Sequence, residues 1–443
     1  MLERRLEYQS LKAVLLHMDA NVRFQISLCM PSIRSVEKVV PLKMNTFFIT
    51  DRSTVVNHTY YEVLVDRKYP NGNSPEGISI DWFRFDSDEF GFPLDFGADV
   101  LLPGDVSFQQ GNQQQERFDT EEYERMYRHD LRHYEKALEK LQELNSRGVT
   151  IEEHLKSLEN VPLESDEDRE VRQILHRDSR DLVSSIEGCK FTLLSFDCRR
   201  NNTKPSFDCY IQLAITEGES SRSKLFEANR RLFEASKYLN DVLFGGRTMP
   251  IRVGEFTLSD DFIIRLPVGF RLQVQKALPC GNSICHKSFP LIVENSEQLN
   301  ILEISSWQLL PAAYEGRIVR NARRLILDDI EEEDEFETLV QVIRDLPNPE
   351  ICIRPNPPTH SIEIYFLIIQ AWLRRDRQVG ASLWMRTWGE KLANDVMESI
   401  RTHCEESNKA EISTSVDMSE SANWEFLDFP EKSWMIKINI VNV

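Results

Sequence analysis

Short strand-like runs alternate with helical segments over the last 200 or so residues, and this alternation constrains the fold more than any other feature of the sequence. The expected strands lie at residues 251–253, 270–274, 299–304, 324–327, 351–353 and 382–386, with a closing strand at 434–441. The expected helices lie at residues 333–346, 361–373 and 390–404. Strand-to-strand steps of about 24 to 31 residues are typical of leucine-rich-type solenoids. Because the strict asparagine-containing consensus is missing, we expect an irregular strand–helix repeat.

A hairpin and a long helix are expected just before this alternation. Residues 191–196 and 210–216 read as two strands joined by a polar loop. Residues 224–244 carry apolar side chains at helical spacing, and Gly245 and Gly246 follow directly. Glycine commonly ends a helix because it adopts left-handed backbone angles without strain, so the helix should stop there.

A heptad pattern predicts charged helices in residues 118–187. Its seam residues follow steps of four and three: Tyr127, Leu131, Tyr134, Leu138 and Leu141. Residues 145–148 break the helix, and a capping-box pattern at Thr150 and Glu153 starts another. Two heptads are short for a coiled coil, so we favour a helical hairpin packed on its own chain, with a coiled-coil dimer as the alternative.

Apolar residues at steps of three and four also predict amphipathic helices near the N-terminus. The first helix carries Leu11, Val14, Leu15 and Met18, and the second carries Phe24 and Ile26 before Pro31 ends it. The expected fold class is α+β, with N-terminal short helices, a small antiparallel β region with an inserted helical hairpin, and C-terminal irregular strand–helix (leucine-rich-like) repeats. The expected boundaries are 1–40 for the short helices, 41–108 for the β region, 109–117 for a polar linker, 118–187 for the hairpin and 188–443 for the remainder.

Charge and cysteine usage limit the partners and the compartment. The 443 residues include 53 Lys and Arg against 72 Asp and Glu, a formal net charge of −19. Such a surface repels nucleic acids and anionic membranes, so we expect neither as a partner. The eight cysteines lack paired spacing, the N-terminus lacks a signal-peptide core, and no apolar run could span a bilayer. We therefore expect a cytoplasmic or nuclear protein.

Several short motifs contain chemically active residues, yet none completes a catalytic, cofactor or metal site. His129 and His133 share a helix face without a third ligand, and the segment 280–286 offers two cysteines and a histidine without a fourth. Asp95-Phe96-Gly97 lacks the other kinase motifs. The acidic run 328–335 is interpreted as a solvated loop, with docking of a basic partner as the alternative. Trp372, Trp384 and Trp388 are interpreted as core residues, with an aromatic binding hot spot as the alternative. We expect no enzyme activity and no cofactor.

Two groups of segments carry a family resemblance. The first is LEYQSLKAVLLHMDANVRFQIS at 6–27, PSIRSVEK at 31–38 and VPLK at 40–43. The second is LNDVLFGGR at 239–247, IRV at 251–253 and IVRNARRLIL at 318–327. Together they resemble the nematode F-box C-type family, in which the first 40 residues look like a degenerate F-box. Leu6-Glu7 stands where an F-box usually opens with Leu-Pro, and the tryptophan often found near its end is missing.

The resemblance implies a substrate-recognition adaptor of a Skp–cullin ubiquitin ligase. By position, the residues offered to a Skp-type adaptor would be Leu11, Val14, Leu15, Met18, Phe24 and Ile26. The C-terminal part would bind an unknown protein target. Two alternatives remain: the short helices pack on the β region, or the chain is a ligase-independent scaffold that uses the helices of residues 118–187.

Overall fold

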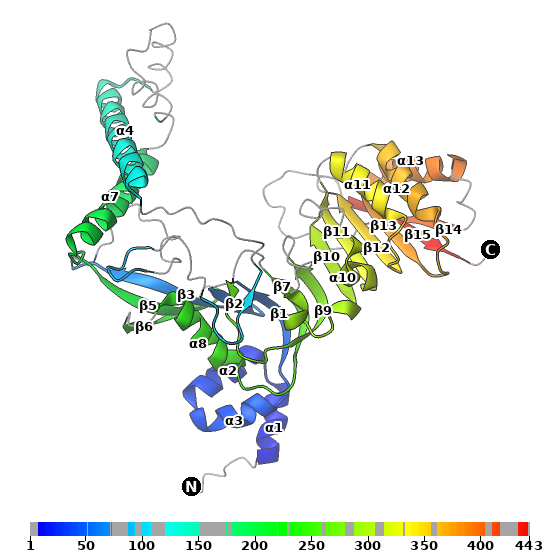
Figure 1. Cartoon of the computed structure of the whole chain (residues 1–443). Coiled ribbons are helices and arrows are strands. Elements are labelled where there is room, and N and C mark those ends of the chain that lie inside the picture. Colours follow the sequence, from blue (N-terminus) through cyan, green and yellow to red (C-terminus); the bar gives the residue numbers. More distant parts are fainter. Residues whose placement is uncertain are drawn as a thin grey trace. The chain divides into compact units, whose positions relative to one another are not determined.

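The chain has a mixed α/β fold that divides into two compact units, shown in Figure 1. The computed structural model describes residues 8–50, 52–70, 72, 87–93, 100–108, 120–150, 174, 179–218, 220–227, 231–258, 263–279, 288–305, 314–330, 333–355, 361–403, 410–416 and 433–441. Unit 1 comprises Met1–Thr59, Leu101–Gln109 and Asn240–Val443, and unit 2 comprises Tyr60–Val100 and Gln110–Leu239. The division falls within helix α8 (Leu232–Phe244).

Unit 1 begins with three short helices: α1 (Tyr8–His17), α2 (Ala20–Cys29) and α3 (Pro31–Val39). The side chain of Asp19 caps α2 by accepting a hydrogen bond from the backbone N–H of Asn21 at 2.8 Å. Pro31 occupies the first turn of α3, where its missing N–H is not needed. The short helices expected from the apolar spacing are confirmed.

The sheet of unit 1 is large and mostly parallel. Its strands are β1 (Lys43–Ile49), β2 (Ser53–Val56), β7 (Ile251–Leu258), β9 (Leu272–Pro279), β10 (Ile301–Ser305), β11 (Arg324–Ile330), β12 (Glu350–Pro355), β13 (Ser382–Trp388), β14 (Ala410–Val416) and β15 (Ser433–Ile440). Their order is β14-β15-β13-β12-β11-β10-β9-β7-β1-β2. Pairing is parallel from β1 through β13, and antiparallel for β1–β2, β13–β15 and β14–β15.

Helices connect successive parallel strands, as parallel pairing requires. From β9 to β13 they are α9 (Phe289–Ile292) with the 3₁₀ turn Ser296–Gln298, α10 (Arg317–Asn321), α11 (Glu333–Ile343) and α12 (Ile362–Leu373), and α13 (Gly389–His403) follows β13 and precedes β14. Figure 1 shows α11, α12 and α13 on one face of the neighbouring strands. Alternate strand residues, including Leu325, Ile351, Leu383 and Met385, are fully buried. The strand–helix alternation expected from the sequence is confirmed, and β14 was not anticipated.

A two-stranded ladder joins β4 (Val106–Ser107) to β8 (Ile263–Ile264) within unit 1. Beside it, the buried side chain of Arg265 contacts the carboxylate of Asp105 at 2.6 Å. This ion pair ties the segment 101–108 to the strands that follow α8.

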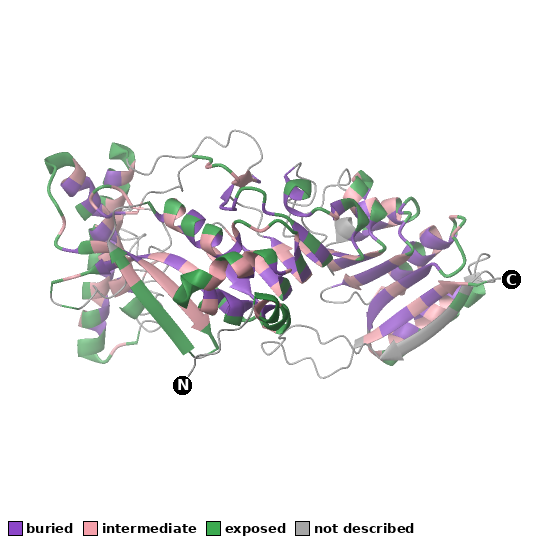
Figure 2. Ribbon diagram, turned by 90° about the horizontal axis from the view of Figure 1, so that it is seen from below, coloured by how far each residue is buried: buried purple, intermediate pink, exposed green. Residues whose placement is uncertain are grey.

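Unit 2 contains β3 (Thr59–Lys68), β5 (Asp208–Glu217), β6 (Ser220–Glu227) and two long helices, α4 (Glu121–Arg147) and α7 (Ser179–Asn201). Strand β5 lies between β3 and β6. Helix α4 lies beside α7 (Figure 1) and packs on it through Ala137, Leu141 and Leu182. Figure 2 shows exposed residues on the outward sides of both helices.

Three expectations are corrected. Residues 191–196 belong to α7 and are not a strand, because a short apolar run fits either periodicity and here continues a helix. The hairpin is formed by β5 and β6, so the helix expected over 224–244 begins only at Leu232. Residues 41–108 do not form a separate small sheet, since β1 pairs in parallel with β7.

Candidate protein-binding surface

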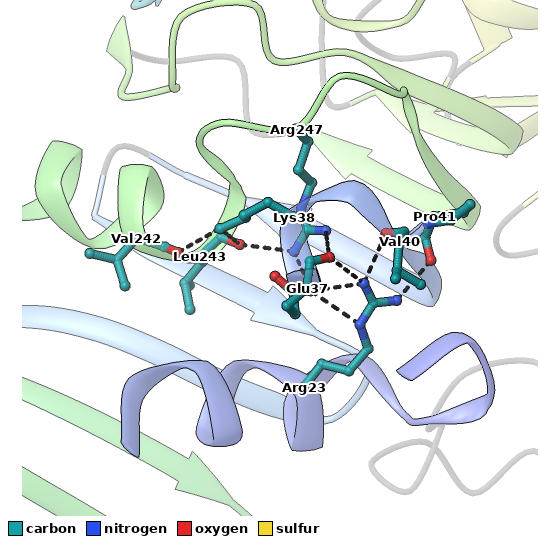
Figure 3. A network of polar contacts seen from close by, with 8 residues as sticks. All are labelled: Arg23, Glu37, Lys38, Val40, Pro41, Val242, Leu243 and Arg247. Atoms are coloured by element: carbon teal, nitrogen blue, oxygen red, sulfur yellow. Dashed lines mark hydrogen bonds and ion pairs between the residues drawn. The ribbon is translucent and has the colours of Figure 1, made fainter. Parts of the chain in front are cut away.

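A buried polar network fixes two of the N-terminal helices, α2 and α3, to the end of α8, as Figure 3 shows. It joins four charged side chains to four backbone segments: Arg23, Glu37, Lys38 and Arg247, with the carbonyls of Val40, Pro41, Val242 and Leu243. All of these residues belong to unit 1. The network therefore sets the orientation of α2 and α3 within that unit.

Arg23 of α2 caps the C-terminal end of α3. Its guanidinium donates to the carbonyl oxygens of Glu37, Val40 and Pro41 at 3.0, 2.9 and 2.7 Å. It also contacts the Glu37 carboxylate at 2.9 Å, and both side chains are 1% exposed. The last carbonyls of a helix lack intrahelical partners, so this one side chain satisfies them while pairing its charge.

Arg247 and Lys38 join α3 to the C-terminal end of α8. Arg247 donates to the Glu37 carboxylate at 2.7 Å. Lys38 donates through Nζ to the carbonyl oxygens of Val242 and Leu243 at 2.7 and 2.8 Å. A cation at a helix C-terminus is favourable because the helix dipole is negative there.

The cations of this network are shifted mainly by burial. Burial lowers the pKa of Arg23 and of Arg247, while the Glu37 carboxylate opposes both shifts. Burial, followed by the charge of Arg247, lowers the pKa of Lys38 to about 7. The single carboxylate thus stabilises two guanidiniums directly, and it also opposes the lowering of the Lys38 pKa that burial and Arg247 cause.

An aromatic cluster underlies the network. Phe24 meets Phe244 edge-to-face with ring centroids 5.6 Å apart, and Phe47 of β1 meets Phe244 at 5.4 Å. Phe24 and the nearby Leu15 of α1 are each 1% exposed. These side chains anchor the helices to the sheet of unit 1.

The outer sides of the same helices are unusually apolar. Within the part of the chain that the structure describes, residues 8–39 hold seven of the twenty exposed large apolar side chains. We call these seven the outer helical surface: Tyr8, Val14, Leu16, Val22, Leu28, Met30 and Val39. Single exposed apolar residues are ordinary, so it is the density of these side chains along one short segment that sets it apart.

The six residues expected to contact an adaptor separate into three groups. Leu15 and Phe24 are buried in the chain's own core, so they anchor the helices and are not offered to a partner. Val14 is 41% exposed. Leu11, Met18 and Ile26 are partly buried. Sequence periodicity identified apolar positions but not which of them face outward, and it missed the other members of the outer helical surface.

The remaining sequence motifs form no metal centre in the described residues, where no group of three metal-binding side chains comes together. The imidazole rings of His129 and His133 lie with centroids 4.0 Å apart and their planes tilted by 49°, and Nδ1 of His133 lies 2.8 Å from the carbonyl oxygen of His129. Three other segments lie outside the described residues: the linker 109–117, Asp95–Gly97 and the segment 280–286. Most side chains of the acidic run 328–335 also lie outside the described part.

The three tryptophans differ in their surroundings. Trp372 of α12 is fully buried, whereas Trp384 of β13 is partly exposed. Lys437 of β15 lies over the Trp384 ring at 4.4 Å and Arg324 of β11 at 5.9 Å. The side chain of Trp388 is outside the described part.

Comparison with known proteins adds one finding. Residues 231–387 match the model of a domain of unknown function (DUF3557). The matched region runs from the start of α8 to the end of β13, and it covers less than half of the chain. No curated protein and no solved structure matches the chain. Among the described helices, none has the length and apolar character needed to cross a lipid bilayer.

Proposed function

We propose that this chain is an F-box-like substrate-recognition adaptor of a Skp–cullin ubiquitin ligase in the cytoplasm or nucleus. The outer helical surface would bind a Skp-type adaptor, and the C-terminal strand–helix region would bind a protein target. The proposal assigns no catalytic role and no cofactor to the chain. The observation that carries it is the concentration of exposed apolar side chains on residues 8–39.

The buried network supports this assignment because it holds two of the three helices in a fixed arrangement. Arg23, Glu37 and Arg247 hold α2 and α3 in one arrangement through ion pairs that exclude water. A preformed surface binds with a smaller loss of conformational entropy than a flexible one. The sequence resemblance of residues 6–43 to the nematode F-box C-type family points to the same segment.

The target would bind to the region that we describe as leucine-rich-like repeats. Strands β9 to β13 follow one another in the sheet in chain order, which is how a solenoid is built. Trp384, flanked by Arg324 and Lys437, provides the aromatic and cationic side chains that dominate many binding hot spots.

Val14→Asp tests the adaptor hypothesis. Val14 is exposed, so aspartate should leave the fold intact, yet it would place a charge against an apolar partner. We expect the affinity of the full chain for a purified Skp-type adaptor, measured by titration calorimetry, to fall at least about tenfold.

Val379→Asp is the matched control, because Val379 is also an exposed valine of unit 1 but lies outside the three helices. Its affinity should equal that of the unmodified chain. Equal affinities for the two variants, or no binding by the unmodified chain, would refute the proposal. Leu15→Asp is not a useful variant, since Leu15 is buried and the helices would lose their anchor.

The alternative function is a ligase-independent scaffold that self-associates through α4. Contact with α7 buries Ala137 and Leu141, but Tyr127, Leu131 and other seam residues stay partly exposed. Sedimentation equilibrium of the full chain separates the two hypotheses. A concentration-dependent dimer that Leu131→Glu dissociates would favour the scaffold.

A further inference from the structure

Strand β6 forms the free edge of the sheet in unit 2. It pairs antiparallel with β5 over eight residue pairs, from Tyr210–Glu227 to Glu217–Ser220. No other strand in the described residues lies beyond it. In an antiparallel pair every second residue directs its backbone N–H and C=O away from the neighbour, so these groups line the edge of β6.

The side chains of β6 give this edge a distinct chemistry. Every residue of the strand whose side chain is described is exposed except the partly buried Leu225. Arg222, Lys224 and Phe226 alternate along the strand and therefore share one face. Lys224 lies 5.1 Å from the centre of the Phe226 ring. Neither Arg222 nor Lys224 forms an ion pair with another described residue.

We propose that the edge of β6 binds an extended acidic peptide by strand addition. The partner's backbone would pair with the outward N–H and C=O groups of β6. Its carboxylates, placed at every second position, would lie opposite Arg222 and Lys224. Cross-strand pairs of opposite charge stabilise such a ladder, and the spacing of the two cations sets the spacing required of the acids.

The charges of β6 disfavour a second copy of this chain as the occupant. Symmetric antiparallel pairing of two β6 strands about Ser223 would place Arg222 directly opposite Lys224. Like charges at directly opposed positions destabilise a strand pair. An acidic peptide therefore pairs with the edge of β6 more favourably than a second copy of this chain does.

This inference is independent of the adaptor hypothesis. Strand β6 belongs to unit 2, whereas the outer helical surface belongs to unit 1. Val14→Asp should leave peptide binding unchanged, so failure of one proposal does not imply failure of the other.

The test uses the full chain and blocked, fluorescein-labelled peptides followed by fluorescence anisotropy. One probe repeats Thr-Glu four times, and the matched probe repeats Thr-Lys. We expect the Thr-Glu probe to bind about tenfold more tightly, as two favourable pairs replace two unfavourable ones. In the double variant Arg222→Glu, Lys224→Glu the preference should reverse.

A third probe separates strand addition from simple charge attraction. It is the Thr-Glu peptide N-methylated at its four central residues, which keeps its charge and loses its backbone donors. We expect its binding to be lost. Equal binding of the methylated and unmethylated probes, or equal binding of Thr-Glu and Thr-Lys, would overturn the proposal. So would a dimer of the unmodified chain that the double variant abolishes, because the edge would then bind a second copy.

Discussion

Glu37 connects two guanidiniums that come from distant parts of the chain. Arg23 and Arg247 both donate to the same carboxylate oxygen, at 3.1 and 2.7 Å. All three side chains are almost fully buried. In such a setting the loss of the anion is costly, because the cations cannot regain hydration without unfolding.

Glu37→Gln should therefore destabilise the chain strongly while preserving the shape of the side chain. We expect the free energy of unfolding, measured in urea, to fall by about 3–5 kcal/mol. The control is Glu294→Gln, which breaks the exposed pair with Arg271 and should cost below about 1 kcal/mol. Similar losses in the two variants would contradict the role given to burial.

Lys38 gives the network a dependence on pH. Its pKa is about 7 in the folded chain, well below the ordinary lysine pKa of 10.5. Between these values the unfolded chain binds more protons, so the contribution of Lys38 to the free energy of unfolding rises with pH. Below about pH 7 both states hold the proton and the contribution is constant.

Lys38→Met should remove this dependence. We expect the difference in free energy of unfolding, unmodified chain minus variant, to be flat below pH 7 and to increase up to about pH 10. Urea unfolding of both proteins across that range measures the difference. Parallel pH profiles would show that Lys38 does not titrate in this window.

The buried polar network around Glu37 could not be predicted from the sequence. Arg23 and Arg247 are separated by about half of the chain, and charged residues are ordinarily assigned to the surface. The apolar residues of α1 and α2 could be recognised from their spacing. Their division into the buried Leu15 and the exposed Val14 could not, because it depends on which side of α1 packs against α3.

At the scale of elements, Arg377 joins the ends of two helices that cover the sheet. Its guanidinium donates to the carbonyl oxygens of Ile343 at 2.9 Å and Trp372 at 3.3 Å, near the ends of α11 and α12. It also lies 5.0 Å from the Trp372 ring. Burial lowers the pKa of Arg377 to about 10.

Arg377→Lys should loosen this junction. Lysine keeps the charge but cannot donate in several directions from a rigid plane, so several hydrogen bonds would be lost. We expect a loss of about 1–2 kcal/mol in the free energy of unfolding in urea. Arg374→Lys, at an exposed position after α12, should change it by less than about 0.5 kcal/mol.

Elements whose apolar residues repeat with one clear period could be predicted from the sequence. Elements whose apolar pattern fits both a helix and a strand could not. Strands β11 and β12 each contain a continuous apolar run between helices, at residues 325–327 and 351–353, which is typical of strands buried on both faces. Residues 191–196 were misread because the run is short and lies within the longer helix α7. Strand β6 was misread because Leu225 and Phe226 fit the helical pattern that continues into α8.

At the scale of the whole molecule, local sequence patterns do not predict that the strands of the large sheet pair in parallel. Residues 43–49 look like part of a small antiparallel region, since β2 follows β1 after a short turn. Yet the other edge of β1 pairs with β7, about two hundred residues later in the chain. Local sequence carries no information about such a partner. The entropic cost of closing a loop rises only slowly with its length, so a strand distant in the sequence can pair as well as a nearby one.

The position of β15 has a consequence for the order in which unit 1 can be completed. Strand β15 lies between β13 and β14 although it follows both in the chain. During synthesis β14 therefore emerges with no strand to pair with, and β13 remains an open edge until residues 433–440 leave the ribosome. A nascent chain stalled before that point would present the open edge of β13 together with a β14 that has no partner on either edge, and unpaired edges favour aggregation.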